Sequence, residues 1–80
     1  MASRPLAEHD VVVLQANLPA YGLVVGDVGT IVFVHRGGEA YEVELATAGG
    51  RTIAVETLPA DRVERVPDGH VLHARPWSVT

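Results

Sequence analysis

The chain contains no cysteine and no lysine, and only four of its 80 residues are aromatic. Without cysteine it can form neither a disulfide framework nor a thiolate metal site, and it has no thiol nucleophile. No apolar stretch approaches the roughly 20 residues that a membrane-spanning helix needs. The first ten residues also lack the apolar core of a signal peptide. We therefore expect a cytoplasmic protein with no membrane association.

Basic charge is also scarce. Six arginines stand against ten acidic residues, which gives a formal net charge of −4 at pH 7. The arginines are scattered along the chain with acids nearby, whereas proteins that bind phosphate backbones gather their basic residues on one face. The charge pattern therefore argues against nucleic acid as a partner.

Aliphatic side chains are abundant, and hydrophobic residues make up 48% of the chain. This share is too high for a disordered protein. Eighty residues make one domain, and a core of this size is only marginally stable on its own. Binding to a partner often adds stability to such a domain.

Short apolar runs alternate with turn residues at the spacing of a small all-β domain. We predict five strands, at residues 9–16, 28–36, 40–46, 51–58 and 62–66. A long loop, 17–27, follows the first strand, and a single 3₁₀ turn at 59–61 precedes the last. This arrangement predicts an SH3-like barrel over residues 8–66 with a C-terminal tail at 67–80, because closing the sheet leaves few exposed edges.

Between Asp10 and Val66 the chain contains, in order, the blocks "GLVVGDVGTIVFV", "AYEVEL" and "TLPADRVE". In these blocks it resembles a family of small bacterial proteins, the domain of unknown function DUF4926. The resemblance covers about 57 residues and leaves the last 14 outside. It implies an SH3-like barrel and no established activity.

The approach to the second predicted strand is rich in glycine, with Gly22, Gly26 and Gly29 around Asp27. Glycine supplies positive φ or close backbone approach where a loop enters a strand, and Asp27 can accept backbone N–H bonds in an Asx turn. A phosphate-binding loop would need a Lys-Ser/Thr pair and a following helix, and the sequence has neither. We interpret these residues as structural, and we expect the apolar side chains of loop 17–27 to cap the open end of the barrel.

The third predicted strand alternates most regularly, with apolar residues on one face and Glu42 and Glu44 on the other. A three-residue turn after it pairs Leu45 with Ile53 of the fourth strand, both inward. This register points Val55 inward as well, and it places Glu42 opposite Glu56 and Glu44 opposite Ala54 on the outer face. Two like charges in that position cost about 0.2–1 kcal/mol.

The hairpin between the second and third strands has two candidate registers. A two-residue glycine turn points Ile31 and Phe33 outward, whereas a three-residue turn buries Phe33 and exposes Val32 and Val34. We prefer the first register, because Gly-Gly is a favoured two-residue hairpin signal.

Exposed apolar side chains grouped on a strand need an explanation. Either the tail, with Trp77, folds back over them, or they bind another chain, such as a partner protein or a second copy in a homodimer. We therefore predict a non-catalytic protein-binding or accessory module that uses the outer face of strands two to four and needs no cofactor. Its candidate interaction residues are Ile31, Phe33, Glu42, Glu44, Glu56 and Trp77.

The alternative function is RNA binding. The Gly-Asp-x-Gly pattern at residues 26–29 resembles the KOW element of ribosomal and transcription-factor barrels, and Arg36 and Arg51 would then contact RNA. The glutamates on strands three and four depart from the basic surfaces of those barrels.

Enzyme and metal chemistry find less support. An enzyme would need a deep pocket around Glu42 or Glu56, and the sequence has no cysteine nucleophile and only two serines, Ser3 and Ser78, both near its ends. His70 and His73 could bind a metal together only in a helical tail, which Gly69 and Pro76 would keep very short. We predict no catalytic residues and no metal site.

Overall fold

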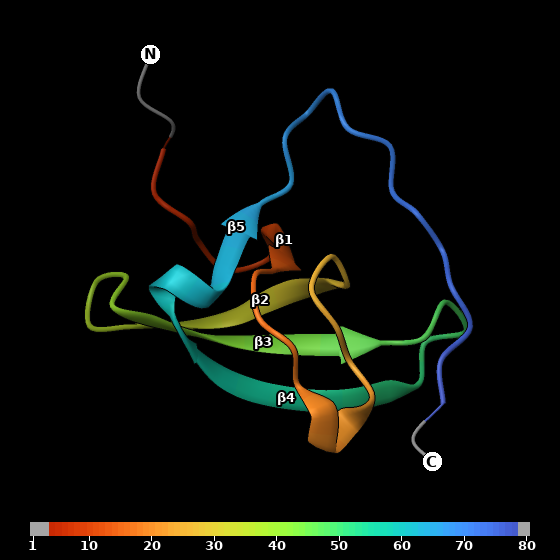
Figure 1. Cartoon of the computed structure of the whole chain (residues 1–80). Helices are drawn as coiled ribbons and strands as arrows, with labels where there is room; N and C mark the ends of the chain where they lie inside the picture. Colours follow the sequence, from red (N-terminus) through yellow and green to blue (C-terminus); the bar gives the residue numbers. More distant parts are fainter. Residues whose placement is uncertain (1–3, 79–80) are drawn as a thin grey trace.

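The computed structural model describes residues 4–78 of the chain (Figure 1). Its five strands are β1 (Val11–Leu14), β2 (Val28–His35), β3 (Ala40–Ala46), β4 (Thr52–Pro59) and β5 (Val63–Arg65). Two short 3₁₀ turns are present, η1 (Pro19–Tyr21) in the β1–β2 loop and η2 (Ala60–Arg62) before β5. The predicted all-β class is confirmed, and η1 is an addition to the predicted elements.

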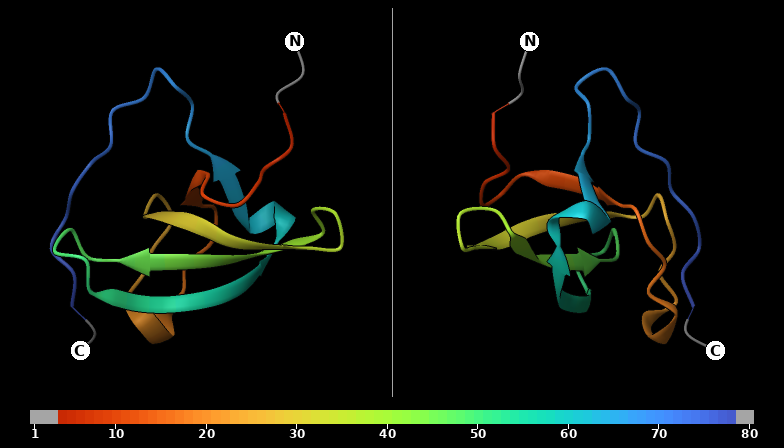
Figure 2. Two further views of the ribbon diagram at one scale, coloured as in Figure 1. Left: turned by 180° about the vertical axis from the view of Figure 1, so that it is seen from behind. Right: turned by 60° about the vertical axis from the view of Figure 1, so that its left-hand side comes forward.

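The strands form one antiparallel sheet in the order β4-β3-β2-β1-β5. The sheet curls, so that β1 and β5 lie over one side of the longer strands β3 and β4 (Figure 2). This is the expected small, barrel-like all-β domain. Its core is a single cluster of apolar side chains from all five strands and the β1–β2 loop, namely Val12, Leu14, Leu23, Ile31, Tyr41, Val43, Leu45, Leu58 and Val63.

The β1–β2 loop caps the barrel as predicted. Leu23 is buried in the core, and Leu18 and Tyr21 pack against it. Asp27 closes the loop through its side chain, because its carboxylate accepts the backbone N–H of Val24, three residues earlier in the chain, at 2.8 Å. This contact differs from the predicted Asx turn, in which the carboxylate accepts an N–H two residues later.

Gly29 lies where β2 crosses β3 at close range. A Cβ at this position would lie 2.6 Å from a Val43 methyl and 2.9 Å from the Glu44 carbonyl oxygen. Only glycine lets the two strands approach this closely without displacing the core. The expected close backbone approach is therefore present.

The β2–β3 hairpin begins in the preferred register, with Phe33 opposite Glu42 on the outer face. A β-bulge between Ile31 and Phe33 then inserts Val32 as an extra residue, and Ile31 pairs with Val43. Ile31 is fully buried. The prediction of an outward Ile31 was therefore wrong, because the bulge reverses the alternation on which it rested.

The β3–β4 hairpin begins in the predicted register, with Ala46 opposite Thr52. The register then shifts by one residue between Ala46 and Leu45, so that Leu45 pairs with Ala54 rather than Ile53. The extra residue in β4 moves the next side chains to the opposite faces. The expected pairing of Glu44 with Ala54 was consequently wrong as well.

This shift separates the predicted pair of carboxylates. Glu56 lies opposite Val43 rather than Glu42, on the face that β4 turns toward the core. Val55, which the predicted register placed inward, lies opposite Glu44 and is half exposed. The outer face therefore carries Val55 where Glu56 was expected.

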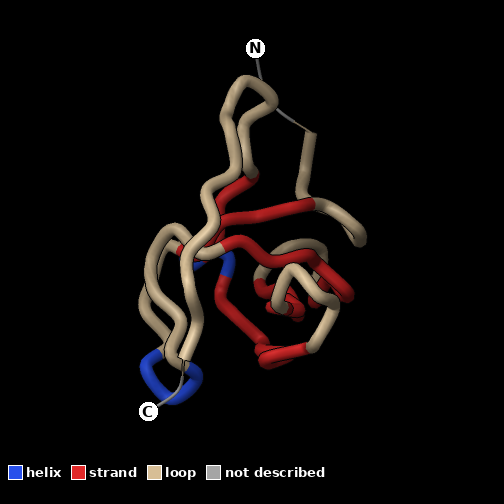
Figure 3. The backbone as a smooth tube through the Cα atoms, turned by 90° about the vertical axis from the view of Figure 1, so that its right-hand side faces the viewer, coloured by secondary structure: helices blue, strands red, loops and turns tan. Residues whose placement is uncertain are grey.

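Beyond β5, the described residues 66–78 form no strand or helix. This segment, the arm, leaves β5 and runs to the end of the barrel where the β1–β2 loop lies (Figure 3). Residues 79–80 of the predicted tail lie outside the described part of the chain. Within residues 4–78, no helical segment has the length and apolar character needed to cross a lipid bilayer.

Candidate functional site

The outer face of β2–β4 exposes apolar side chains as predicted, but they are not all the predicted ones. Phe33 is 46% exposed and Val55 is 50% exposed. Phe33 lies opposite Glu42, and Val55 lies opposite Glu44. The two apolar groups therefore stand on either side of β3, each next to a carboxylate.

One of these carboxylates is held by a hydrogen bond, because the Thr52 hydroxyl donates to Glu44 at 2.6 Å. The His35 ring packs edge-on against Phe33, with the ring centroids 4.7 Å apart, and its Nε2 lies 3.4 Å from the Glu42 carboxylate without a hydrogen bond. The face thus presents two apolar groups and two anionic groups to solvent.

Two of the predicted interaction residues have structural roles instead. Ile31 is part of the core. Glu56 is partly buried, and its carboxylate accepts a hydrogen bond of 3.0 Å from the Tyr21 hydroxyl. This hydrogen bond and the negative charge of Glu56 raise the pKa of Tyr21. Glu56 therefore fastens the β1–β2 loop to β4.

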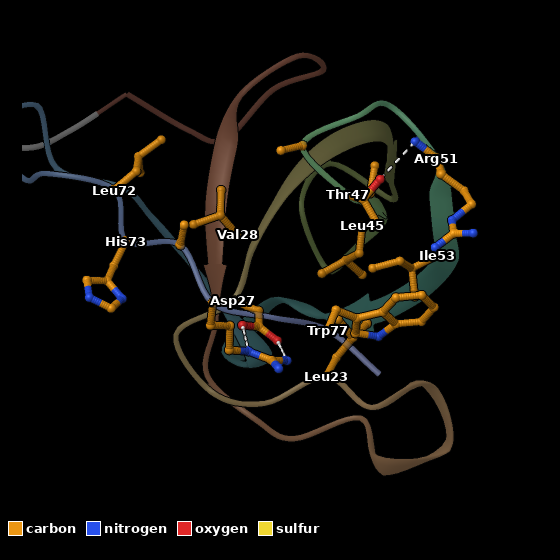
Figure 4. Close-up of a pocket in the computed structure, with 14 residues that line it drawn as sticks. Leu23, Asp27, Val28, Leu45, Thr47, Arg51, Ile53, Leu72, His73 and Trp77 are labelled. Atoms are coloured by element: carbon orange, nitrogen blue, oxygen red, sulfur yellow. Dashed lines mark hydrogen bonds and ion pairs between the residues drawn. The ribbon is translucent and has the colours of Figure 1, made fainter. Parts of the chain in front are cut away.

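The arm closes one side of a pocket of about 520 Å³ at the barrel end (Figure 4). Pockets of this size can hold small ligands or a few side chains. The β1–β2 loop, the β3–β4 turn and the arm form its walls. Its lining includes the apolar residues Leu23, Val28, Leu45, Ile53, Leu72 and Trp77 and the charged residues Asp27, Arg51 and Arg75.

Trp77 lies in this pocket rather than over the outer face. The alternative in which the tail covers the outer face was therefore wrong: the tail packs at the barrel end, and Phe33 stays uncovered by the described residues. Arg75 forms an ion pair of 2.6 Å with Asp27, which is the residue that closes the loop. The guanidinium of Arg75 lowers the pKa of Asp27 and thus keeps its carboxylate charged.

A second charge cluster lies at the start of β1. Arg4 donates two hydrogen bonds of 2.9 Å to Asp10, and Arg65 of β5 donates one of 3.2 Å. The hydrogen bonds from Arg4 and from the Ala7 N–H hold the pKa of Asp10 well below its usual range. This cluster ties the N-terminal segment to β5, and we interpret it as structural.

Most of the arginines are already engaged. Four guanidinium groups contact carboxylates, and Arg51 lies over the Trp77 ring at 5.6 Å.

His70 and His73 belong to the exposed arm. In the described residues, no cluster of three or more His, Asp or Glu side chains could hold a metal ion.

Comparison with known proteins identifies the barrel. The family model for the domain of unknown function DUF4926 matches residues 8–65. Searches of the curated proteins and of the solved structures found no match. The family match covers all five strands, the β1–β2 loop and Asp27, while the arm lies outside it. The chain belongs to the DUF4926 family, as its sequence blocks suggested.

Proposed function

We propose that this chain is a non-catalytic, cytoplasmic protein-binding module that uses the outer face of β2–β4. The observation that carries the proposal is the pairing of half-exposed Phe33 and Val55 with the carboxylates of Glu42 and Glu44. Exposed apolar groups rimmed by polar ones are typical of protein interaction sites.

The charges on this face favour a different protein over a second copy. A symmetric dimer places the same patch on both sides of the interface, so Glu42 and Glu44 would approach the same carboxylates of the partner. Like charges brought together at an interface cost free energy. A partner that offers apolar side chains flanked by arginine or lysine would instead complement both features.

The arginine contacts support a protein rather than RNA as the partner. RNA binding needs guanidinium or ammonium groups that are free to meet phosphates. Arg51, which the RNA alternative would use, already stacks on Trp77. Arg36, at the tip of the β2–β3 hairpin, is a single charge beside the acidic outer face.

Affinity capture with matched variants tests the proposal. Tagged wild type, Phe33→Glu and Val71→Glu are exposed to the same cell extract; Val71 is 94% exposed on the arm and serves as the control for added charge. We expect proteins that wild type and Val71→Glu retain and that Phe33→Glu loses, with retention falling as salt rises. Equal retention by all three would overturn the proposal.

Light scattering on the purified wild type separates the two kinds of partner. We expect the mass of a single 8.5 kDa chain across a concentration series. A dimer that Phe33→Glu dissociates would show that the face binds a second copy instead of a different protein.

A further inference from the structure

The arm is held at the barrel end by a small set of specific contacts. Arg75 donates from Nε and Nη2 to the two oxygens of Asp27, at 2.8 and 2.6 Å, and from Nη2 to the Gly22 carbonyl at 2.9 Å. A guanidinium that meets both oxygens of a carboxylate forms one of the stronger and more directional contacts in proteins. Asp27 thus binds one arginine through both of its carboxylate oxygens.

Trp77 provides the second anchor. Its indole N–H donates to the Tyr21 carbonyl at 2.8 Å, its ring packs against the core cluster, and Arg51 lies over it. The indole therefore satisfies its donor while covering apolar surface, which is how tryptophan acts in many interfaces.

Gly22 is shaped to receive this segment. A Cβ at Gly22 would lie 2.6 Å from the Ser78 carbonyl oxygen and 3.3 Å from the indole nitrogen of Trp77. The absence of a side chain at Gly22 thus leaves the space that the arm backbone fills.

The rest of the arm contributes little to this docking. Side chains from Pro67 to Ala74 are exposed, and within the described chain the only backbone hydrogen bond of this stretch joins its own residues His70 and Pro67. The specific contacts at the barrel end therefore come from residues 75–78. None of these hydrogen bonds uses a residue of the stretch 67–74.

We propose that the barrel end is a binding site for an extended Arg-x-Trp segment of a partner polypeptide, and that residues 75–77 occupy this site in cis. The receptor groups Tyr21, Gly22 and Asp27 belong to the barrel that the family model matches, whereas the bound segment lies outside that match. The arm is an intramolecular competitor, whose effective concentration at the site is set by the 67–74 tether. This site is separate from the outer face of β2–β4.

A peptide titration tests this site with the full chain. The receptor is the double variant Arg75→Ala/Trp77→Ala, which keeps the arm but lacks both anchors. The probe is a fluorescein-labelled peptide of residues 70–78, HVLHARPWS, followed by fluorescence anisotropy. We expect saturable binding, and binding at least tenfold weaker to wild type, because its own arm competes.

Control variants locate the binding. Asp27→Asn in the double-variant background keeps one oxygen to accept the Val24 N–H but loses the charge, so we expect peptide affinity to fall at least tenfold. Asp61→Asn removes an exposed carboxylate elsewhere and should leave it unchanged. Phe33→Glu should also leave it unchanged, which separates this site from the outer face.

Two results would overturn the proposal. One is the absence of saturable binding to the double variant when circular dichroism shows a folded barrel. The other is equal affinity of the peptide for wild type, the double variant and its Asp27→Asn derivative, which would show that the peptide binds elsewhere.

Discussion

The outer face of β2–β4 and the barrel end both expose apolar surface of the same small sheet, yet only one of them is covered by the described chain. At the barrel end, the chain supplies an arginine and a tryptophan that fit Asp27 and the Tyr21 carbonyl. On the outer face, Phe33 and Val55 remain half exposed beside two glutamates. In this barrel, apolar surface is covered where polar anchors fix the covering segment, because apolar contact alone has no preferred geometry.

The largest loss of stability is expected from a substitution in the core, compared with one on the outer face. Ile31→Ala removes a fully buried side chain and should lower the free energy of unfolding by about 2–5 kcal/mol. Phe33→Ala, on the outer face, should cost less than about 1 kcal/mol. Urea unfolding followed by circular dichroism measures both. If Phe33→Ala costs as much as Ile31→Ala, the outer face is covered and the contrast with the barrel end disappears.

The next largest loss of stability is expected where a glycine contacts the arm. Two glycines with nearly the same positive φ, one against the arm and one away from it, provide the comparison. Gly22 has φ 69° and faces the arm, whereas Gly37 has φ 68° and no neighbouring atom within 4 Å of the point that a Cβ would occupy. Gly37→Ala should cost about 1–2 kcal/mol for the left-handed conformation alone. Gly22→Ala should cost about 1 kcal/mol more and release Trp77, because the methyl displaces the Ser78 carbonyl.

Urea unfolding gives the two free energies, and the emission wavelength of Trp77 reports the arm. A red shift for Gly22→Ala without one for Gly37→Ala is the expected pattern. Equal costs and equal spectra would mean that the arm does not rest on Gly22.

A smaller effect is expected from removing the aromatic anchor itself. Trp77→Ala should cost about 1–2 kcal/mol, since the half-buried indole covers part of the core cluster. Val71→Ala, at an exposed position of the same arm, is the control and should change the free energy of unfolding by less than about 0.5 kcal/mol. If both variants unfold like wild type, the arm contributes nothing to stability.

The smallest effect is expected from acid. Arg75 lowers the pKa of Asp27 below its ordinary 3.8, so the ion pair is complete above that pH and is lost as the pH falls through the lowered value. The contribution is small because solvent screens the exposed pair. Trp77 emission should shift to the red below pH 3.8, and this step should be missing in Asp27→Asn. An identical step in both proteins would assign it to another carboxylate.

The sequence predicts the elements of this fold better than their registers. The bounds of β3 were predicted correctly, because Tyr41, Val43 and Leu45 alternate with polar residues throughout the strand. In β2, residues 31–34 are all apolar, so no polar side chain marks which face is outward, and the bulge leaves no trace in the pattern. The run at 53–55 in β4 is ambiguous for the same reason.

The residues of the candidate sites were also predicted well where neighbours in the sequence decide their orientation, and poorly where a contact joins distant parts of the chain. Glu42 and Glu44 were correctly placed on the outer face by the alternation of β3, and Phe33 by the register that the Gly-Gly turn predicted. The pairing of Asp27 with Arg75 joins residues 48 positions apart and has no local signature. One signal could have found it: Trp77, the only tryptophan of the chain, follows shortly after an arginine in an otherwise poorly structured segment.

The arm follows the barrel in the chain, so it is synthesised after the residues that it contacts. Tyr21, Gly22, Asp27 and Arg51 precede the arm in the chain, so synthesis supplies the whole receptor before it supplies Arg75 and Trp77. Arg75 and Trp77 bond to the β1–β2 loop and take no part in the hydrogen bonds of the sheet. During synthesis the barrel end therefore lacks these contacts until residues 75–77 have been made.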